Sequence, residues 1–202
     1  MTPITPLILK ETAKGIQTVR PEDELYASRK LFLVGEVSSE SMTALLMQLM
    51  CLEEDECTDE ITLYINSPGG EVKSGLSVYD YIRQMKTPVR TVCIGTAASM
   101  GSILFLAGDK REMYPHSELM IHDPSTQVGS YEKPEQLRTR LESLVEVSRS
   151  LAEIISERSG MDIEEVNRLT KTDTYYNAQA ALKSGLATSI INTNTKEEIN
   201  ND

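Results

Sequence analysis

The stretch that decides the fold is residues 89–107, which read VRTVCIGTAASMGSILFLA. Val89 to Ile94 is rich in β-branched residues and predicts a short strand. Gly95 to Gly101 consists of small residues apart from Met100, which indicates a tight turn. Met100 to Ala107 is apolar enough for a buried helix. Together they predict a strand, a sharp turn and a helix in direct succession.

The same succession occurs twice earlier in the chain. Residues 30–35 (KLFLVG) predict a strand ended by a glycine, and residues 41–52 (SMTALLMQLMCL) predict a mostly buried helix. Residues 61–66 (ITLYIN) predict a second strand that stops at the SPGG of residues 67–70, and helical spacing resumes over residues 72–85. Strands that alternate with helices in this way predict an α/β fold with a largely parallel sheet and right-handed crossovers.

The second half of the chain predicts one more strand and a long helix. Residues 119–122 (LMIH) predict the strand, which ends at Asp123-Pro124. Beyond it, the positions of one helical stripe follow at steps of three or four residues: Leu137, Leu141, Leu144, Ser148, Leu151 and Ile155. Such a stripe must be buried, either against another subunit or within its own domain.

The two ends of the chain look different from the core. Residues 1–20 mix Pro3, Pro6 and Gly15 with isolated apolar residues, which predicts an irregular arm. Residues 192–202 are polar and predict a disordered tail.

Composition excludes several classes of partner. The 202 residues include 20 Lys and Arg but 31 Asp and Glu, a net charge of −11, so neither nucleic acid nor an acidic membrane surface is an expected partner. The apolar stretch at residues 92–108 is too short and too polar to span a bilayer, and no secretory signal pattern begins the chain. Cys51, Cys57 and Cys93 lack metal-site spacing and are typical of buried thiols in a reducing compartment. We therefore expect a cytoplasmic protein without a metal site.

The small-residue turn places Ser99 at the N-terminus of a predicted helix. Free N–H groups and the positive end of the helix dipole would favour a developing oxyanion there. A serine in this position can instead serve only as the N-cap of the helix. The glycine turn at residues 67–70 also follows a strand, so a parallel sheet brings both turns to its carboxyl edge. The amides of Gly70 and Met100 could then converge on one carbonyl oxygen.

A serine nucleophile needs a base and a group that orients the base. The chain has two histidines. His116 lies in a turn-like segment, whereas His122 ends a strand at the expected active edge and is the better candidate. Three carboxylates remain possible as the third group, because spacing cannot choose among Asp173, Asp123 and Asp109.

Three ordered motifs carry a resemblance to a known family: YINSPGG at residues 64–70, GTAASMG at 95–101 and MIH at 120–122. They resemble the motifs of the proteolytic subunit of the ATP-dependent Clp protease, the ClpP family of serine peptidases. The resemblance covers roughly residues 31–190. Asp173, with NAQAA at 177–181 and SGLA at 184–187, resembles the family's stretch around its catalytic aspartate. The resemblance therefore selects Asp173, and it implies Gly70 and Met100 as oxyanion donors.

The resemblance implies a ClpP/crotonase-like fold and a self-compartmentalising serine endopeptidase without cofactor or metal of its own. It implies an axial arm at residues 1–20 and a peptidase domain at 21–191 with a handle helix at about 132–158. Heptameric rings would stack as a tetradecamer through the handle. An AAA+ unfoldase of the ClpX, ClpA or ClpC type would use ATP and feed in unfolded polypeptides.

Two positions differ from the usual pattern of the family. Thr172 stands where the family usually has an Arg before the catalytic Asp, and Asp123 stands where it usually has Gln after the His. Both positions belong to contacts between rings, and Thr cannot replace a bidentate Arg. An alternative is therefore a weakly active or structural subunit that needs a ClpP paralogue. A remote alternative is a crotonase-type acyl-CoA enzyme, which would use paired amides without a Ser/His pair.

Overall fold

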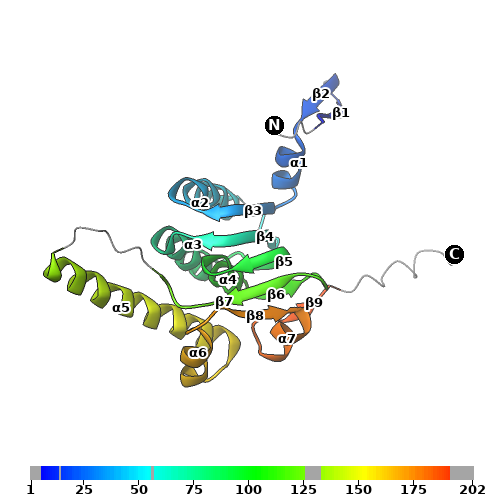
Figure 1. Cartoon of the computed structure of the whole chain (residues 1–202). Helices are drawn as coiled ribbons and strands as arrows, with labels where there is room; N and C mark the ends of the chain where they lie inside the picture. The colour runs from blue at the N-terminus through cyan, green and yellow to red at the C-terminus, as the bar shows by residue number, and fades with distance from the viewer. Residues whose placement is uncertain (1–5, 14, 56, 126–132, 192–202) are drawn as a thin grey trace.

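The computed structural model describes residues 6–13, 15–55, 57–125 and 133–191. Its centre is a sheet with helices packed against it (Figure 1). The three predicted strand and helix units are present: β3 (Lys30–Val37) with α2 (Ser39–Glu54), β4 (Ile61–Gly70) with α3 (Val72–Gln84), and β5 (Val89–Ala98) with α4 (Met100–Leu106). The predicted α/β class is confirmed.

All three strands are longer than predicted, and in β4 and β5 the reason is that residues of the small-residue turns still pair with the neighbouring strands. Residues 67–70 were expected to stop β4, yet Gly69 and Gly70 pair with Glu36 and Val37 of β3 after a register shift. Ser67 pairs in the same way with Ala97 of β5. The two turns therefore extend the carboxyl edge of the sheet.

Among the described residues the main sheet has seven strands in the order β3-β4-β5-β6-β9, with β7 paired to β5 and β8. The remaining strands are β6 (Lys110–Met113), β7 (Glu118–Ile121), β8 (Thr174–Asn177) and β9 (Ser189–Ile190). Every pairing in it is parallel except that of β7 with β8. On one side, β5 pairs with two strands: its residues 90–93 pair with β6 and its residues 96–98 pair with β7.

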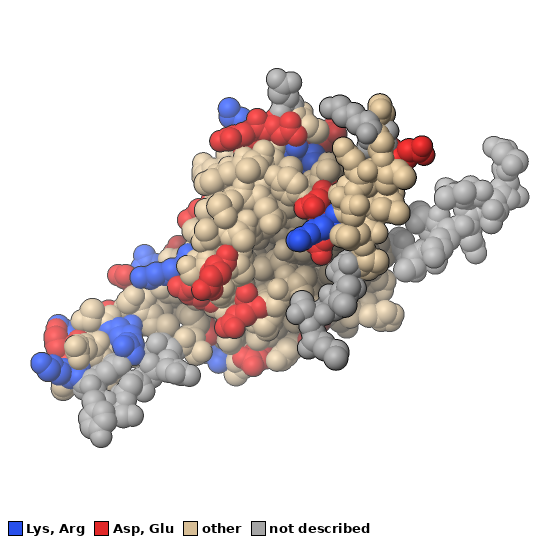
Figure 2. Space-filling view, turned by 90° about the horizontal axis from the view of Figure 1, so that it is seen from above, with Lys and Arg blue, Asp and Glu red and all other residues tan. Residues whose placement is uncertain are grey.

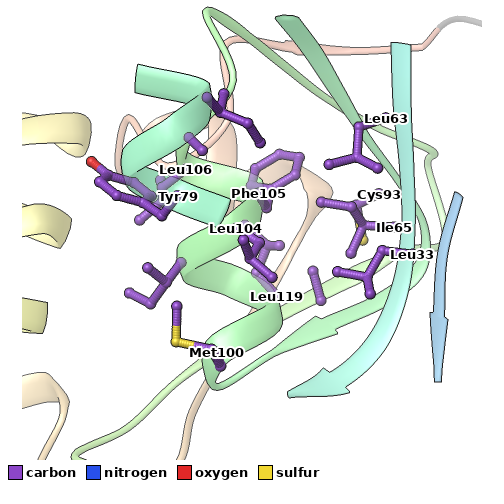
Figure 3. Close-up of a cluster of buried hydrophobic side chains, with 14 of the residues drawn as sticks. Leu33, Leu63, Ile65, Tyr79, Cys93, Met100, Leu104, Phe105, Leu106 and Leu119 are labelled. Carbon is purple, nitrogen blue, oxygen red and sulfur yellow. The ribbon is translucent and has the colours of Figure 1, made fainter. Parts of the chain in front are cut away.

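The main core lies between the sheet and α4, all seven residues of which are buried. Figure 3 shows Leu104 and Phe105 of α4 beside Leu63, Ile65 and Cys93 of the strands. The expectation that α2 is mostly buried was wrong. It buries one face only, at Met42, Leu45, Leu49 and Leu52.

The expectation of an irregular arm at residues 1–20 was wrong for residues 8–12 and 15–19, whereas residues 1–5 and 14 lie outside the described residues. β1 (Ile8–Thr12) and β2 (Gly15–Val19) form an antiparallel hairpin, followed by α1 (Pro21–Ala27). Gly15 has a φ of 112°, which allows the hairpin to turn there. Lys10 Nζ lies 2.6 Å from a carboxylate oxygen of Glu24 and ties the hairpin to α1. The hairpin projects away from the sheet (Figure 1).

The predicted long helix is α5 (Pro134–Ser159), and it ends at Gly160, which has a φ of 78°. Its second half packs on the core through the buried side chains of Leu151 and Ile155. Its first half extends from the body (Figure 1), and there Leu141 is 49% and Val145 68% exposed. The stripe is therefore buried within its own domain only in part. The chain continues through α6 (Ile163–Leu169) and α7 (Ala178–Lys183).

Several predicted features fall outside the described residues: residue 132 at the predicted start of the handle and the tail at 192–202. Acidic side chains are spread over the face shown in Figure 2, as expected from the net charge of −11. No helix in the described ranges is both long and apolar enough to cross a membrane.

Candidate active site

Ser99 lies at the junction of β5 and α4 in a strained backbone conformation, with φ 54° and ψ −123°. A positive φ is costly for a residue with a side chain and requires support from its surroundings. The Ser99 N–H donates to Met120 O at 2.9 Å, and the hydroxyl of Ser102 donates to Ser99 O at 2.7 Å. The junction therefore fixes the direction of the Ser99 side chain.

The Ser99 hydroxyl does not cap α4. Ser99 occupies the N-cap position, but its side chain makes no capping hydrogen bond. Its Oγ lies 2.8 Å from Nε2 of His122 instead. The interpretation of Ser99 as a simple N-cap was therefore wrong.

His122 reaches Ser99 because it directly follows β7. Leu119 and Met120 of β7 pair with Ala97 and Ala98 of β5, so the two strands end side by side. The His122 side chain is 25% exposed. His116 lies in the exposed turn between β6 and β7, as predicted.

The three candidate carboxylates lie in different places. Oδ1 of Asp173 lies 3.2 Å from Nδ1 of His122, because β8 pairs with β7 and brings Thr174 opposite Ile121. Asp123 accepts a hydrogen bond from the hydroxyl of Ser148 on α5 at 3.1 Å. Asp109 accepts hydrogen bonds from Arg83 and from the Val89 N–H at the amino end of β5. Of these three described carboxylates, Asp173 is the one that contacts the imidazole of His122.

The two glycine turns meet beside Ser99. A Cβ placed on Gly69 would lie 2.9 Å from the nitrogen of Met100, and one placed on Gly70 would collide with the carbonyl oxygen of Val37. Met100 is the first residue of α4, so its N–H belongs to the helix terminus that has no acceptor within the helix. The role of the Gly70 and Met100 amides as oxyanion donors stays a prediction.

One hollow adjoins the Ser99 and His122 pair, and a second lies next to it. The smaller has a volume of about 20 Å³ and is walled by α3, α4, α5 and the end of β7. The larger, about 760 Å³, lies between the start of α3 and the first half of α5. The two hollows share Val72 and Pro124 in their walls, so they are neighbours.

Sequence reasoning missed two hydroxyls that support the site. The hydroxyl of Ser102 donates a hydrogen bond to the carbonyl oxygen of Ser99. The hydroxyl of Ser148 donates one to the carboxylate of Asp123, which directly follows His122 in the chain. A signal for Ser148 existed, because it is the polar member of the apolar stripe of α5. A small polar residue in such a stripe indicates a specific partner.

The cysteines only partly match the expectation of buried thiols. Cys93 is fully buried in β5, and burial is the main cause that raises the pKa of its thiol. Cys51, however, is exposed on α2, and Cys57 is partly exposed. For Cys51 the expectation was wrong, because it lies on the uncovered face of that helix.

Ser99, His122 and Asp173 lie in series at the carboxyl edge of the sheet. This arrangement of a hydroxyl, an imidazole and a carboxylate has the geometry of the Ser-His-Asp class of hydrolases. A sequence model of the Clp protease family matches residues 13–194. The chain therefore belongs to the Clp protease family, a family of peptidases.

Proposed function

We propose that this chain is a serine endopeptidase subunit in which Ser99 is the nucleophile, His122 the general base and acid, and Asp173 the group that orients His122. The observation that supports this most strongly is the chain of contacts from Asp173 Oδ1 through the imidazole to Ser99 Oγ, at 3.2 Å and 2.8 Å. The first distance is an ion-pair contact and the second a hydrogen bond, and together they place the imidazole between the carboxylate and the hydroxyl, as acyl transfer needs.

The reaction follows from these positions. Nε2 of His122 accepts the hydroxyl proton as Ser99 Oγ attacks the peptide carbonyl, and Asp173 stabilises the imidazolium. The amides of Gly70 and Met100 hold the negative charge of the tetrahedral intermediate. His122 then gives the proton to the leaving amine, and water hydrolyses the acyl ester by the same route. These steps use neither nucleotide nor metal.

We also propose that the chain works in heptameric rings, stacked through α5, with an AAA+ unfoldase that uses ATP and supplies unfolded polypeptides. The exposed Leu141 and Val145 on the projecting half of α5 support a contact between rings, since the described residues leave these apolar side chains uncovered. The projecting hairpin of β1 and β2 suits an axial arm. Family membership supports both points.

A second candidate is a weakly active subunit that needs a paralogue for full activity. Two observations favour it: the side chain of Asp173 is 57% exposed, and Thr172 beside it is exposed as well. In a triad the carboxylate is ordinarily buried, because water competes for its hydrogen bond. A neighbouring ring that covers Asp173 would strengthen its hold on His122.

The test is labelling of the purified chain and of Ser99→Ala with a small fluorophosphonate, read by intact mass, together with cleavage of short peptides. The proposed function requires one label on the wild type and none on Ser99→Ala, with loss of peptide cleavage. Turnover retained by Ser99→Ala contradicts it. Native mass spectrometry and assays with and without a typical paralogue separate the two candidates, since strong activity of the chain alone dismisses the second.

A further inference from the structure

We propose that Ser148 and Asp123 act as a pair of positioning residues that hold His122 in line between Ser99 and Asp173. This inference rests on the proposed function, because it takes His122 as the general base. It adds two residues outside the triad, one of them on α5, on which the rate of the chemical step depends.

The backbone of His122 is anchored by the sheet on one side only. Before it, β7 pairs with β5 and β8, and the carbonyl oxygen of Met120 accepts the Ser99 N–H at 2.9 Å. After it, Pro124 has no N–H with which the ladder could continue. The direction in which the chain leaves His122 therefore depends on how Asp123 is held.

Asp123 is held by two contacts that come from different elements. Its N–H donates to the carbonyl oxygen of Thr170 at 2.7 Å, and Thr170 is a buried residue at the end of α6, shortly before Asp173. Its Oδ1 accepts the hydroxyl proton of Ser148 on α5 at 3.1 Å. Asp123 thus joins the segment that carries Asp173 to α5, and it does so at the residue next to His122.

The hydroxyl of Ser148 makes an unusual contact for a serine inside a helix. Such hydroxyls commonly donate to a carbonyl oxygen one turn earlier in their own helix, and Ser150 does so with Glu146 O at 3.1 Å. Ser148 donates instead to a carboxylate that is 25 residues away in the chain. The contact is partly buried, so water competes for it less than at the surface. A hydrogen bond to an ionised carboxylate is also stronger than one between neutral groups.

Loss of the Ser148 hydroxyl would release the Asp123 side chain and leave only the backbone contact with Thr170. A displacement of about 1 Å in a catalytic group can cost about a hundredfold in rate. Because one of the two contacts remains, we expect a smaller loss, of about tenfold in kcat. Neither Ser148 nor Asp123 lines the two hollows at the site, so KM should change by less than about twofold.

The test is steady-state cleavage of a short peptide by the full chain and by Ser148→Ala, with kcat expressed per active site as titrated with a small fluorophosphonate. Alanine is a better helix former than serine, so the variant keeps α5. We expect kcat per site to fall by about tenfold at a nearly constant KM. Ser150→Ala is the matched control and should keep the wild-type kcat, because its hydroxyl donates within its own helix. Fewer titrated sites with an unchanged kcat per site would show a merely structural role and overturn the inference.

Two further comparisons identify the group that matters. Ser148→Thr keeps a hydroxyl and should recover most of the kcat that Ser148→Ala loses; equal losses in the two variants count against the inference. Asp123→Ala removes the acceptor, so we expect a loss of at least the same size. The double variant Ser148→Ala/Asp123→Ala should be no slower than Asp123→Ala alone, because the two side chains act through one contact. Losses that multiply would show that the two residues act independently and would overturn the pairing.

The fluorophosphonate also separates this inference from the proposed function. If it labels Ser99 in the wild type while Ser148→Ala keeps the wild-type kcat per site, only the inference is overturned. If it fails to label Ser99 in the wild type, the proposed function is overturned and the inference with it.

Discussion

Gly69 lies directly against Ser99: a Cβ placed on Gly69 would be 2.7 Å from the Cβ of Ser99. Real Cβ atoms essentially never approach so closely, so the absence of a side chain at residue 69 lets the turn after β4 pack on the turn after β5. The contact also brings the Gly69 backbone to the nitrogen of Met100. The position of the candidate nucleophile thus depends on a residue thirty positions earlier in the chain.

Gly69→Ala should therefore lower activity through the position of Ser99, in addition to lowering stability. The methyl group would push Ser99 away from His122, and a displacement of about 1 Å in a catalytic group can cost about a hundredfold in rate. Gly35→Ala is the matched control: Gly35 has a φ of 89°, close to the 94° of Gly69, but nothing lies within 4 Å of its added Cβ. Both variants pay the strain of a positive φ, about 1–2 kcal/mol.

The comparison of thermal midpoint with kcat/KM for these two variants checks this prediction. Gly69→Ala is expected to lose more stability than Gly35→Ala, because its methyl group also collides with the backbone of Ala98 and Met100, and to lose about a hundredfold in kcat/KM, whereas Gly35→Ala keeps its activity. Equal losses of activity in the two variants would show that the close contact has no special role.

Asp173→Asn should lower kcat by about a thousandfold to ten-thousandfold. The amide can hold the imidazole in the wrong tautomer, with the proton on Nε2, where Ser99 needs an acceptor. Asp80→Asn, on the exposed side of α3, is the control and should leave kcat unchanged. Steady-state kinetics on a short peptide measures both. A loss below tenfold for Asp173→Asn would show that the exposed carboxylate contributes little in this chain.

The repeated strand and helix units could be predicted from sequence because their strands are apolar and their helices follow glycine turns. The strands β6, β8 and β9 could not be predicted from sequence. They are two to four residues long, and their pairing, rather than any local pattern, makes them strands. The hairpin of β1 and β2 was missed for a related reason, since its prolines and glycine indicate irregular backbone until the two strands are seen to pair.

The candidate site also contains residues that local sequence features reveal and one residue that depends on strand pairing. Ser99 and His122 could be identified from a small-residue turn and a strand end, both of which are local features. Asp173 could not be separated from Asp123 by spacing, because its contact with His122 depends on the register in which β8 pairs with β7. That register links segments about fifty residues apart. Only the family resemblance selected Asp173 beforehand.

Arg111→Met should destabilise the fold by about 3 kcal/mol or more. The guanidinium is buried and donates to the carbonyl oxygens of Leu186, Arg158 and Gly185 at 2.9, 3.0 and 3.1 Å. Removing it leaves carbonyl groups at the ends of α5 and α7 without these donors. Arg149→Ala, at a side chain 78% exposed, is the control and should cost less than about 0.5 kcal/mol. Urea unfolding of both variants measures the difference, and equal midpoints would contradict the prediction.

Glu53 should make stability depend on pH on the acid side. Its carboxylate accepts hydrogen bonds from the Lys86 and Thr87 N–H groups at 2.8 and 3.2 Å and so ties the end of α2 to the segment before β5. A side-chain hydrogen bond with Thr87 is the main cause that lowers the pKa of Glu53 from its ordinary 4.5. Because the folded pKa is the lower one, the stabilisation is fully present above the unfolded value and is lost as pH falls through the folded value.

We therefore expect Glu53→Gln to cost about 1 kcal/mol at pH 7, a modest figure because the carboxylate is largely solvated. The difference from wild type should shrink as the pH is lowered below about 4.5, where protonation weakens the same bonds in the wild type. Urea unfolding at pH 7 and at pH 3.5 to 4 checks it. Glu54→Gln is the neighbouring control and should show little effect at either pH, since Glu54 is exposed. A difference that grows on acidification would contradict the assignment, because it would require Glu53 to stabilise the fold in its protonated form.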